Sequence, residues 1–409
     1  MPVLRNIGQL ATCRPAGAQG EIHTIPQAAL AWKDGVVAWV GPEPDLPAAH
    51  RNERELDAEG RLVVPGLVDA HTHLAFGGWR AGEFRERALG RTYQEIAAAG
   101  GGILSTVQAT RLQGEPELLH RCVAFVERMV ALGITTIECK SGYCLDTEGE
   151  LKLLRVYAEL DRRGPAHIVP TFLGAHVVPP EYRDDRGAYV RLLVEEMLPA
   201  VAAGGLAGFC DAFVEQSAFT VEEAKLVLNA AARLGLPGKL HADQLTDGGG
   251  ARLAAEVGAV SADHLEHVSD EGISALARAG VVAVSLPLAG LYLSQPPLNA
   301  RRLIEAGVPV AVATDFNPGS APSYHLPLAL TLACVRQRMT PAEALKGATA
   351  LAARAVGRED RIGSLEKGKS ADFVVLDAPD VDTWLYHFEP NACVLTVIGG
   401  RVCWRRGPS

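Results

Sequence analysis

The chain has 409 residues, and 39 Lys and Arg against 48 Asp and Glu give a formal net charge of −9, with 48% apolar residues. No dense basic run is present, which argues against a nucleic-acid or anionic-membrane surface. At about 100–200 residues per domain this length suggests two or three domains, although one α/β barrel can use about 250. We expect a small-molecule substrate.

No segment has the pattern of an export signal or a membrane span. The first residues, MPVLRNIGQLATCRP, lack a basic region followed by an apolar one. The uncharged stretch 279–300 is long enough to cross a bilayer, but Pro287, Gly290, Pro296 and Pro297 interrupt it. We therefore predict a buried strand followed by an irregular loop there, and a cytoplasmic protein without a membrane partner.

The two ends of the chain predict short strands, whereas the middle of the chain predicts alternating strands and helices. Residues 31–40 contain the turn signal Asp34-Gly35, and residues 369–376 and 393–404 alternate or run apolar. From residue 61 onward, short Val- and Ile-rich runs alternate with longer segments of helical periodicity, which is typical of βαβ units.

Counting these runs decides between an open sheet and a closed barrel. Eight strands are predicted, at 62–69, 134–140, 168–174, 208–215, 238–242, 260–265, 281–286 and 308–314. Helical segments such as 148–162, 188–202, 221–234 and 270–279 follow them. The predicted fold class is therefore α/β, with an eight-stranded (β/α)8 TIM barrel.

The connection between the first and second predicted strands is unusually long, at about sixty residues, and includes a Gly-rich segment at 97–111. Long connections on the catalytic face of a barrel usually form binding loops or lids. A peripheral helical decoration is the alternative.

Polar residues gather where the predicted strands end, which is where barrel enzymes carry their chemistry. These ends are Asp69-Ala-His71-Thr-His73, Lys140-Ser-Gly-Tyr143, His176, Glu215, His241-Ala-Asp243-Gln244, Asp263-His264 and Asp315-Phe-Asn317.

The pair His71 and His73 suggests a metal site. Residues i and i+2 of an extended strand point the same way, so the two imidazoles face one point. With His241 and Asp315 they form an N3O ligand set that suits Zn²⁺ or Fe. Two surface histidines on a strand are the ordinary alternative for a lone HxH.

These residues resemble the metal-dependent amidohydrolase superfamily, through PGLVDAHTHL at 65–74, the histidines that close strands five and six, and the aspartate that closes strand eight. The resemblance implies a composite β-sandwich from residues 1–61 and 367–409 beside a barrel at 62–366. Many members with two metals have a lysine at the end of strand four, where Glu215 stands here. This implies one metal ion, Zn²⁺ or Fe³⁺, without His264 as a necessary ligand.

Longer blocks resemble one branch of that superfamily, whose members hydrolyse 4-imidazolone-5-propanoate to N-formimidoyl-L-glutamate in histidine degradation. The blocks include ECKSGYCLD, FLGAHVVPPEY, HADQLTDGGG and ATDFNPGSAP. The resemblance implies attack by a metal-bound hydroxide on the ring amide, and it implies a homodimer. Some members have a glutamate at the position of Gln244.

The implied chemistry gives each remaining residue a role. His264 is expected to orient the hydroxide and stabilise developing charge, Asp315 to accept the water proton, and His176 to polarise the carbonyl. Gln244 can exchange hydrogen bonds with the ring amide but cannot carry a proton at neutral pH. A satisfied core histidine is the alternative for His264.

The propionate of this substrate needs a cation, and a guanidinium can bind a carboxylate through two hydrogen bonds. Arg80 is the candidate, with a solvated surface arginine as its alternative. Tyr143, Asn317, Gly319 and Ser320 are expected to line the same site. For Lys140 two partners remain possible, the propionate of the substrate and the carboxylate of Glu138.

Two other functions fit the same pattern. A mononuclear deaminase of a purine, pyrimidine or related amidine shares the metal-binding motif, but it would release ammonia and has no need of Arg80. A catalytically dead barrel would serve as a scaffold, yet all four candidate ligands are present.

Overall fold

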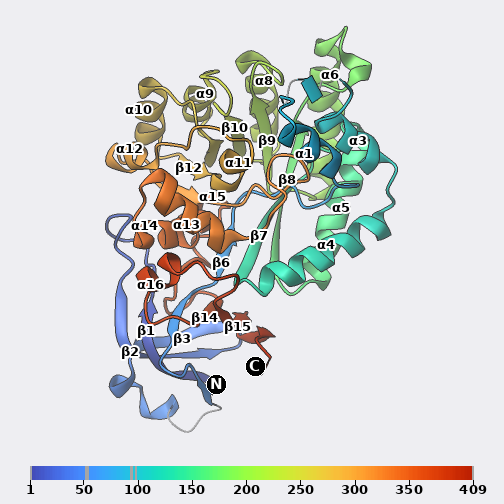
Figure 1. Cartoon of the computed structure of the whole chain (residues 1–409). Coiled ribbons are helices and arrows are strands. Elements are labelled where there is room, and N and C mark those ends of the chain that lie inside the picture. The colour runs from blue at the N-terminus through green and yellow to red at the C-terminus, as the bar shows by residue number, and fades with distance from the viewer. Residues whose placement is uncertain (1, 51–54, 93–94, 97–98, 408–409) are drawn as a thin grey trace.

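The computed structural model describes residues 2–50, 55–92, 95–96 and 99–407, and two sheets organise them (Figure 1). One is a sheet of eight parallel strands in the order β6 to β13. Its strands are β6 (Leu67–Asp69), β7 (Ile134–Lys140), β8 (His167–Ala175), β9 (Phe209–Val214), β10 (Gly238–Ala242), β11 (Ser261–His264), β12 (Val282–Ser285) and β13 (Val310–Val312). The predicted α/β barrel is confirmed.

The ring closes just beyond the last and first strands. Thr72 and Phe316 form a parallel bridge there. The amide of Asp315 donates to the carbonyl of His71 at 3.0 Å, and the amide of His73 donates to the carbonyl of Phe316 at 2.9 Å. Closure of the barrel therefore fixes the predicted metal ligands of the first strand against that of the eighth.

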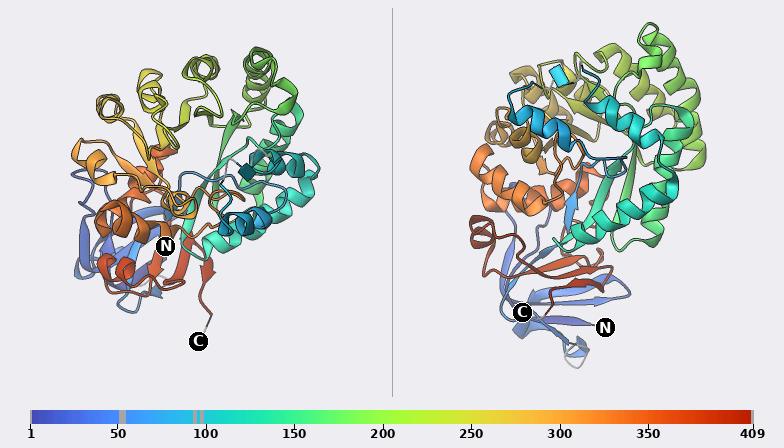
Figure 2. Two further views of the ribbon diagram at one scale, coloured as in Figure 1. Left: turned by 45° about the horizontal axis from the view of Figure 1, so that its top comes forward. Right: turned by 45° about the vertical axis from the view of Figure 1, so that its right-hand side comes forward.

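The second sheet joins the two ends of the chain, as predicted, and contains eight strands. They are β1 (Val3–Ala11), β2 (Thr24–Lys33), β3 (Val36–Pro42), β4 (Glu55–Asp57), β5 (Leu62–Pro65), β14 (Phe373–Leu376), β15 (Cys393–Ile398) and β16 (Arg401–Arg405). The first and last described strands both belong to this sheet, which lies below the barrel in Figure 1 and in the right-hand view of Figure 2.

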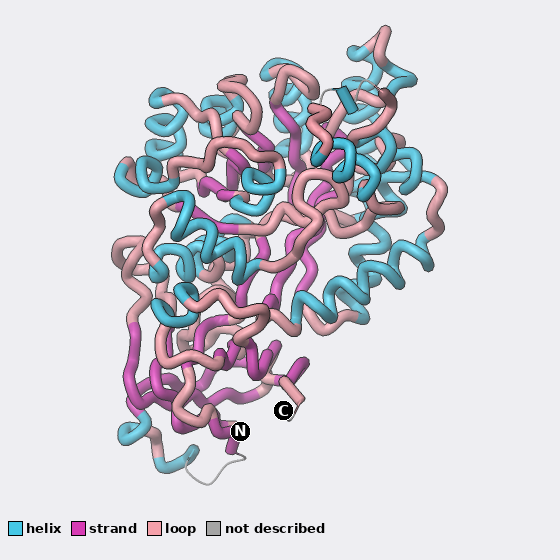
Figure 3. Tube along the Cα trace, in the orientation of Figure 1, coloured by secondary structure: helices cyan, strands magenta, loops and turns pink. Residues whose placement is uncertain are grey.

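Helices surround the barrel strands (Figure 3). They are α1 (Ala81–Ala88), α3 (Ile103–Arg111), α4 (Glu115–Val130), α5 (Thr147–Arg163), α6 (Arg186–Leu192), α7 (Leu198–Gly204), α8 (Val221–Arg233), α9 (Gly250–Glu256), α10 (Asp270–Ala279), α11 (Pro287–Tyr292), α12 (Ala300–Glu305), α13 (Leu326–Gln337), α14 (Pro341–Gly347), α15 (Ala350–Ala355) and α16 (Val381–Tyr386). A π-helical turn, Leu193–Met197, joins α6 to α7, and short 3-10 turns are Glu43–Asp45, Ala48–His50 and Pro180–Tyr182.

The prediction of one barrel strand over 62–69 is wrong. The chain forms β5, then passes Gly66, and only then forms β6. β5 pairs with β1 and β14 in the terminal sheet, whereas β6 pairs with β7 in the barrel. A Cβ on Gly66 would lie 2.2 Å from Oγ1 of Thr135, so the crossing point packs too closely for a side chain. An apolar run cannot reveal that its two halves pair with different sheets.

The long connection after β6 carries α1, α3 and α4, and residues 97 and 98 of its Gly-rich segment lie outside the described residues. The uncharged stretch 279–300 forms β12, the short helix α11 and irregular chain, close to the prediction. Within the described residues, no helix combines the length and apolar character that a bilayer crossing requires.

A buried lysine ties the loop between β1 and β2 to helix α14 of the barrel. The Lys346 side chain donates to the carbonyls of Ala16, Ala18 and Glu21 at 3.0–3.1 Å, and Lys346 is only 1% exposed. One ammonium group thus binds three backbone carbonyls of this loop.

We predict that Lys346→Met destabilises the protein by about 1–3 kcal/mol, because the thioether cannot replace the three hydrogen bonds that the buried ammonium donates to this loop. Thermal unfolding followed by circular dichroism should show a lower midpoint. Lys367→Met, which removes an exposed lysine, is the control and should leave the midpoint unchanged. An unchanged midpoint for Lys346→Met would contradict the prediction.

Candidate active site

Five imidazoles and one carboxylate meet at the carboxyl ends of the barrel strands, and each of these residues is at most 7% exposed. They are His71, His73, His176, His241, His264 and Asp315. Oδ1 of Asp315 lies 3.4 Å from Nε2 of His71 and 3.5 Å from Nε2 of His73. The Nε2 atoms of His73 and His241 are 3.4 Å apart. The four predicted ligands therefore converge on one point.

This arrangement fits a metal ion. Three overlapping groups have ligand atoms within 4.8 Å of one another: His71 with His73 and Asp315, His71 with His241 and His264, and His73 with His176 and His241. Nε2 of His71 is buried and makes no hydrogen bond to any described residue. Imidazole nitrogens with one carboxylate oxygen form a donor set typical of zinc and iron.

Groups behind the imidazoles set their orientation. Oδ2 of Asp263 lies 2.6 Å from Nδ1 of His71, and Oδ2 of Asp211 lies 3.2 Å from Nδ1 of His241. Nδ1 of His176 donates to the carbonyl of Gly142 at 3.0 Å. When Nδ1 carries the proton, Nε2 has a free lone pair for a metal or a substrate.

Burial keeps most of these imidazoles neutral. It lowers the pKa of His241 to about 4 and holds the pKa values of His176 and His264 well below their ordinary range. Burial also opposes a proton on His71, but the neighbouring carboxylates of Asp263 and Asp315 raise its pKa to about 9. Neutral imidazole is the form that binds a metal.

Two of the site residues have a backbone conformation that side chains rarely adopt. The φ angles of His264 and Asp315 are 78° and 57°, in the left-handed region. Such a conformation costs about 1–3 kcal/mol and persists where the surrounding structure imposes it. Behind His264 lies Glu266, whose Oε2 is 3.8 Å from Nδ1 of His264. Burial raises the pKa of Glu266 to about 8.

A cavity of about 550 Å³ opens in front of this cluster. Among the predicted site residues, its walls include Arg80, Tyr143, His176, Gln244, His264, Asp315, Asn317 and Ser320. His71 and Gly319 are not among the residues that line it. The long connection contributes Arg80, Thr92, Gly101, Ile103 and Leu104, which agrees with a binding loop.

Apolar wall residues were missed by the sequence analysis, which followed polar residues only. They include Ile103, Leu104, Val177, Phe213 and Leu293. In sequence they read as ordinary core positions.

Aromatic packing and one glycine place Arg80 at the cavity. The loop before it is anchored by Phe76, whose ring lies 5.0 Å from that of Trp79 and 5.8 Å from that of Phe316. A Cβ on Gly319 would lie 1.4 Å from Nη2 of Arg80. Because Gly319 has no side chain, the Arg80 guanidinium can occupy the space next to its Cα atom.

The turn after β13 is organised by Asn317. Its Oδ1 accepts hydrogen bonds from the amides of Gly319 and Ser320 at 2.8 and 2.7 Å. Its Nδ2 donates to the carbonyl of Asp315 at 2.7 Å. These hydrogen bonds hold Asp315, Gly319 and Ser320 in one turn, and Gly319 is the residue against which Arg80 packs.

Of the two partners considered for Lys140, the structure shows Glu138. The Lys140 ammonium is fully buried, 2.8 Å from Oε1 of Glu138 and 2.7 Å from Oδ2 of Asp211. Sequence reasoning missed Asp211, although a charged residue inside the apolar run FCDAFV was a signal for it. Glu215 accepts from the amides of Leu245 and Thr246, so it holds the loop beside Gln244.

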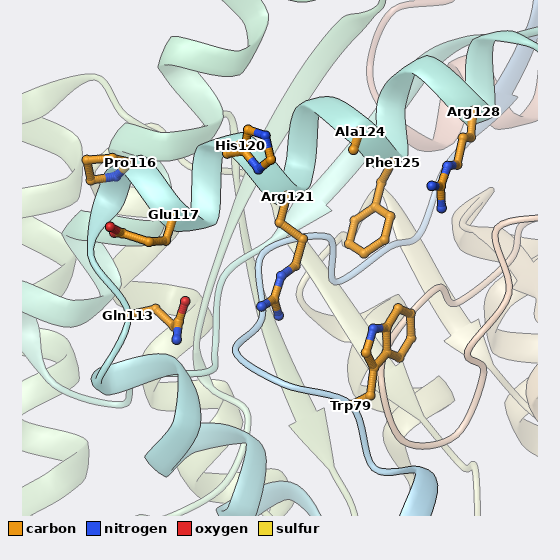
Figure 4. Close-up of a pocket in the computed structure, with 9 residues that line it drawn as sticks. All are labelled: Trp79, Gln113, Pro116, Glu117, His120, Arg121, Ala124, Phe125 and Arg128. Carbon is orange, nitrogen blue, oxygen red and sulfur yellow. The ribbon is translucent and has the colours of Figure 1, made fainter.

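A second hollow, of about 660 Å³, lies on the outer side of α4 and contains none of the predicted site residues. Figure 4 shows Trp79, Arg121 and Phe125 side by side at its edge. Arg121 donates to the carbonyl of Phe76 at 2.8 Å, so this region supports the loop that carries Arg80.

The profile of the amidohydrolase family matches residues 62–403. The chain therefore belongs to the amidohydrolase family. Guanine deaminase from E. coli has the same fold, with a TM-score of 0.74, 18% identity and coverage of 100% of both chains. A triazine hydrolase variant superimposes with a TM-score of 0.75 at 18% identity, covering 98% of this chain and 94% of that one.

Much closer relatives are proteins named imidazolonepropionase. That of Symbiobacterium thermophilum is 49% identical over 404 residues, covering 97% of this chain and 95% of its own length. That of Anaeromyxobacter dehalogenans is 48% identical over 412 residues, covering 100% and 97%. This similarity places the chain in the imidazolonepropionase branch of the family.

We predict that His73→Ala lowers the metal content of the purified protein at least about tenfold, because it removes a buried imidazole whose Nε2 faces both Asp315 and His241. Elemental analysis by mass spectrometry measures the effect. His267→Ala removes an exposed histidine three residues after His264 and should leave the metal content unchanged. Equal metal content in the two variants would contradict this ligand assignment.

Proposed function

We infer that this protein hydrolyses the ring amide of 4-imidazolone-5-propanoate to N-formimidoyl-L-glutamate. In this reaction water forms a bond to the ring carbonyl carbon, the carbon–nitrogen bond breaks, and the ring nitrogen takes up a proton. One observation carries the assignment: a histidine-rich metal site and a nearly buried arginine face the same cavity. The imidazolonepropionase relatives, which match almost the whole chain, support it.

His71, His73, His241 and Asp315 are the proposed metal ligands, and the donor set accepts one Zn²⁺ or Fe³⁺. When bound, the metal lowers the pKa of water from 15.7 to about 7 and so supplies a nucleophile at neutral pH. The residues around the metal accept protons and stabilise the charge that develops during the reaction. Asp315 accepts the proton of the attacking water.

The remaining residues bind and orient the substrate. His264 stabilises the charge that develops on the carbonyl oxygen, and His176 directs its free Nε2 into the cavity because its Nδ1 is held by Gly142. Gln244 exchanges hydrogen bonds with the ring amide. Tyr143, Asn317 and Ser320 line the wall around the ring and its tail.

Arg80 is the proposed partner of the propionate. Its side chain is 9% exposed, and its Nε lies 3.4 Å from Oε2 of Glu83. Among the described residues, no hydrogen bond or ion pair engages the outer nitrogens of this guanidinium, so they can bind a carboxylate. The charge of −9 over the whole chain does not oppose this, because a nearby buried cation dominates the local field.

The test of this function is a direct assay of the metal-loaded protein. Imidazolone-propanoate absorbance should fall, and N-formimidoyl-L-glutamate should appear in equal amount without release of ammonia. Ammonia release from a purine or pyrimidine would instead support the deaminase that shares this fold. An inactive protein with a full complement of metal would refute the assignment.

The division of the chain, the cytoplasmic location and the homodimer belong to the same proposal. The predicted boundary at 366 is kept, whereas the boundary predicted at 61 moves past β5, because β5 pairs with β1 and β14 in the terminal sheet. Sedimentation of the purified protein would test the dimer.

We predict that Arg80→Ala raises the KM for 4-imidazolone-5-propanoate about 10- to 150-fold, from the about 1.5–3 kcal/mol that a hydrogen bond to a charged group is worth. Metal content should not change. Arg85→Ala, on the exposed side of α1, is the matched control and should behave like the wild type. Loss of metal along with activity would show that Arg80 has been assigned the wrong role.

We further predict that Gly319→Ala reproduces much of the Arg80→Ala defect, because the new methyl group would occupy the place of Nη2 of Arg80. The decisive measurement is the double variant. If Gly319 acts through Arg80, Gly319→Ala should cost little in kcat/KM once Arg80 is already alanine. Fully additive losses would mean that Gly319 has another function.

A further inference from the structure

A single buried ammonium group connects the supports of two proposed metal ligands. The Nζ atom of Lys140 lies 2.7 Å from Oδ2 of Asp211 and 3.5 Å from Oδ2 of Asp263. The same two carboxylate oxygens face the metal site from the other side. Oδ2 of Asp211 lies 3.2 Å from Nδ1 of His241, and Oδ2 of Asp263 lies 2.6 Å from Nδ1 of His71.

The position of Lys140 excludes direct contact with a substrate in the cavity. Its side chain is 0% exposed, and the residue is not among those that line the cavity in the described part of the chain. Its third partner, Glu138, also points toward the ligands, because Oε2 of Glu138 lies 3.4 Å from the amide of Thr72. Lys140 therefore belongs to the layer beneath the histidines.

We propose that Lys140 is a positioning residue of the metal centre, whose ammonium holds Asp211 and Asp263 where they orient His241 and His71 with Nε2 toward the metal. The proposal rests on the metal site of the proposed function. It concerns binding of the metal and is independent of which substrate the enzyme hydrolyses.

The arrangement requires a cation for an electrostatic reason. Glu138, Asp211 and Asp263 place three carboxylates in one fully buried layer, where their mutual repulsion is poorly screened. Without Lys140, the three carboxylates would repel one another, and at least one would turn away from its imidazole. That movement would free a ligand histidine to rotate.

A second buried lysine offers a matched control. Lys239 is also fully buried, but its ammonium donates to the carbonyl of Ala355 at 2.9 Å, and its nearest carboxylate oxygen in Glu138 lies 3.9 Å away. Among the described residues, no hydrogen bond or ion pair within 4.0 Å joins this ammonium to Asp211 or Asp263. Lys239→Met therefore removes a buried ammonium from the same layer without breaking the link to the ligands.

The test measures Co²⁺ binding to the metal-free full-length protein by chelator competition, together with the visible absorption band of the bound Co²⁺. Lys140→Met should weaken Co²⁺ binding about 10- to 100-fold, the usual effect of losing an outer partner of a metal ligand, and should change the band. Lys239→Met should keep the affinity and band of the wild type even if its unfolding midpoint falls. Lys140→Arg, which keeps the charge, should recover part of the affinity.

Wild-type affinity and an unchanged band in Lys140→Met would overturn the proposal, as would an equal loss in Lys239→Met. If Lys140→Met does not fold, Co²⁺ binding is measured in Lys140→Arg and Asp263→Asn instead. Both should weaken Co²⁺ binding and alter its band, and wild-type behaviour of both would refute the link. An enzyme that binds Co²⁺ as expected but leaves imidazolone-propanoate intact would refute the proposed function alone.

Discussion

Closure of the barrel between its first and eighth strands is the constraint on which the site depends. The hydrogen bonds between the backbones of His71 and Asp315, and of His73 and Phe316, are the join itself. The same residues carry the proposed metal ligands, so the site cannot form unless the ring closes. In return, the left-handed backbone of Asp315 is imposed by that join.

Beyond this join, the molecule is arranged in layers around the metal site. A wall that contains the nearly buried Arg80 faces the cavity, and a layer of buried charges supports the histidines from behind. Gly319 and Arg80 illustrate how tightly the front layer is packed, since the guanidinium occupies the space of a missing side chain. Lys140 illustrates the rear layer, where three carboxylates share one ammonium group. In the function that we propose, binding of the anionic substrate and binding of the metal thus depend on separate parts of the fold.

Most of the barrel and of the candidate site could be predicted from the sequence, because the carboxyl ends of the strands in a parallel barrel share one face. Seven of the eight predicted barrel strands were placed within a few residues, and the polar residues after them do converge. The first strand was misjudged because apolar character does not identify a strand's partner, and Gly66 separates two sheets. The apolar cavity wall was missed for a similar reason, since residues such as Phe213 differ from core residues only in what they face.

The sequence by itself determined the alternation of strands and helices, the HxH pair and the set of polar residues available for chemistry. These are local properties, fixed by spacing along the chain. Only the tertiary structure decided which distant residues meet: that Lys140 pairs with Asp211, and that Gly319 makes room for Arg80. These two contacts join residues 71 and 239 positions apart, and their geometry depends on how the whole ring closes.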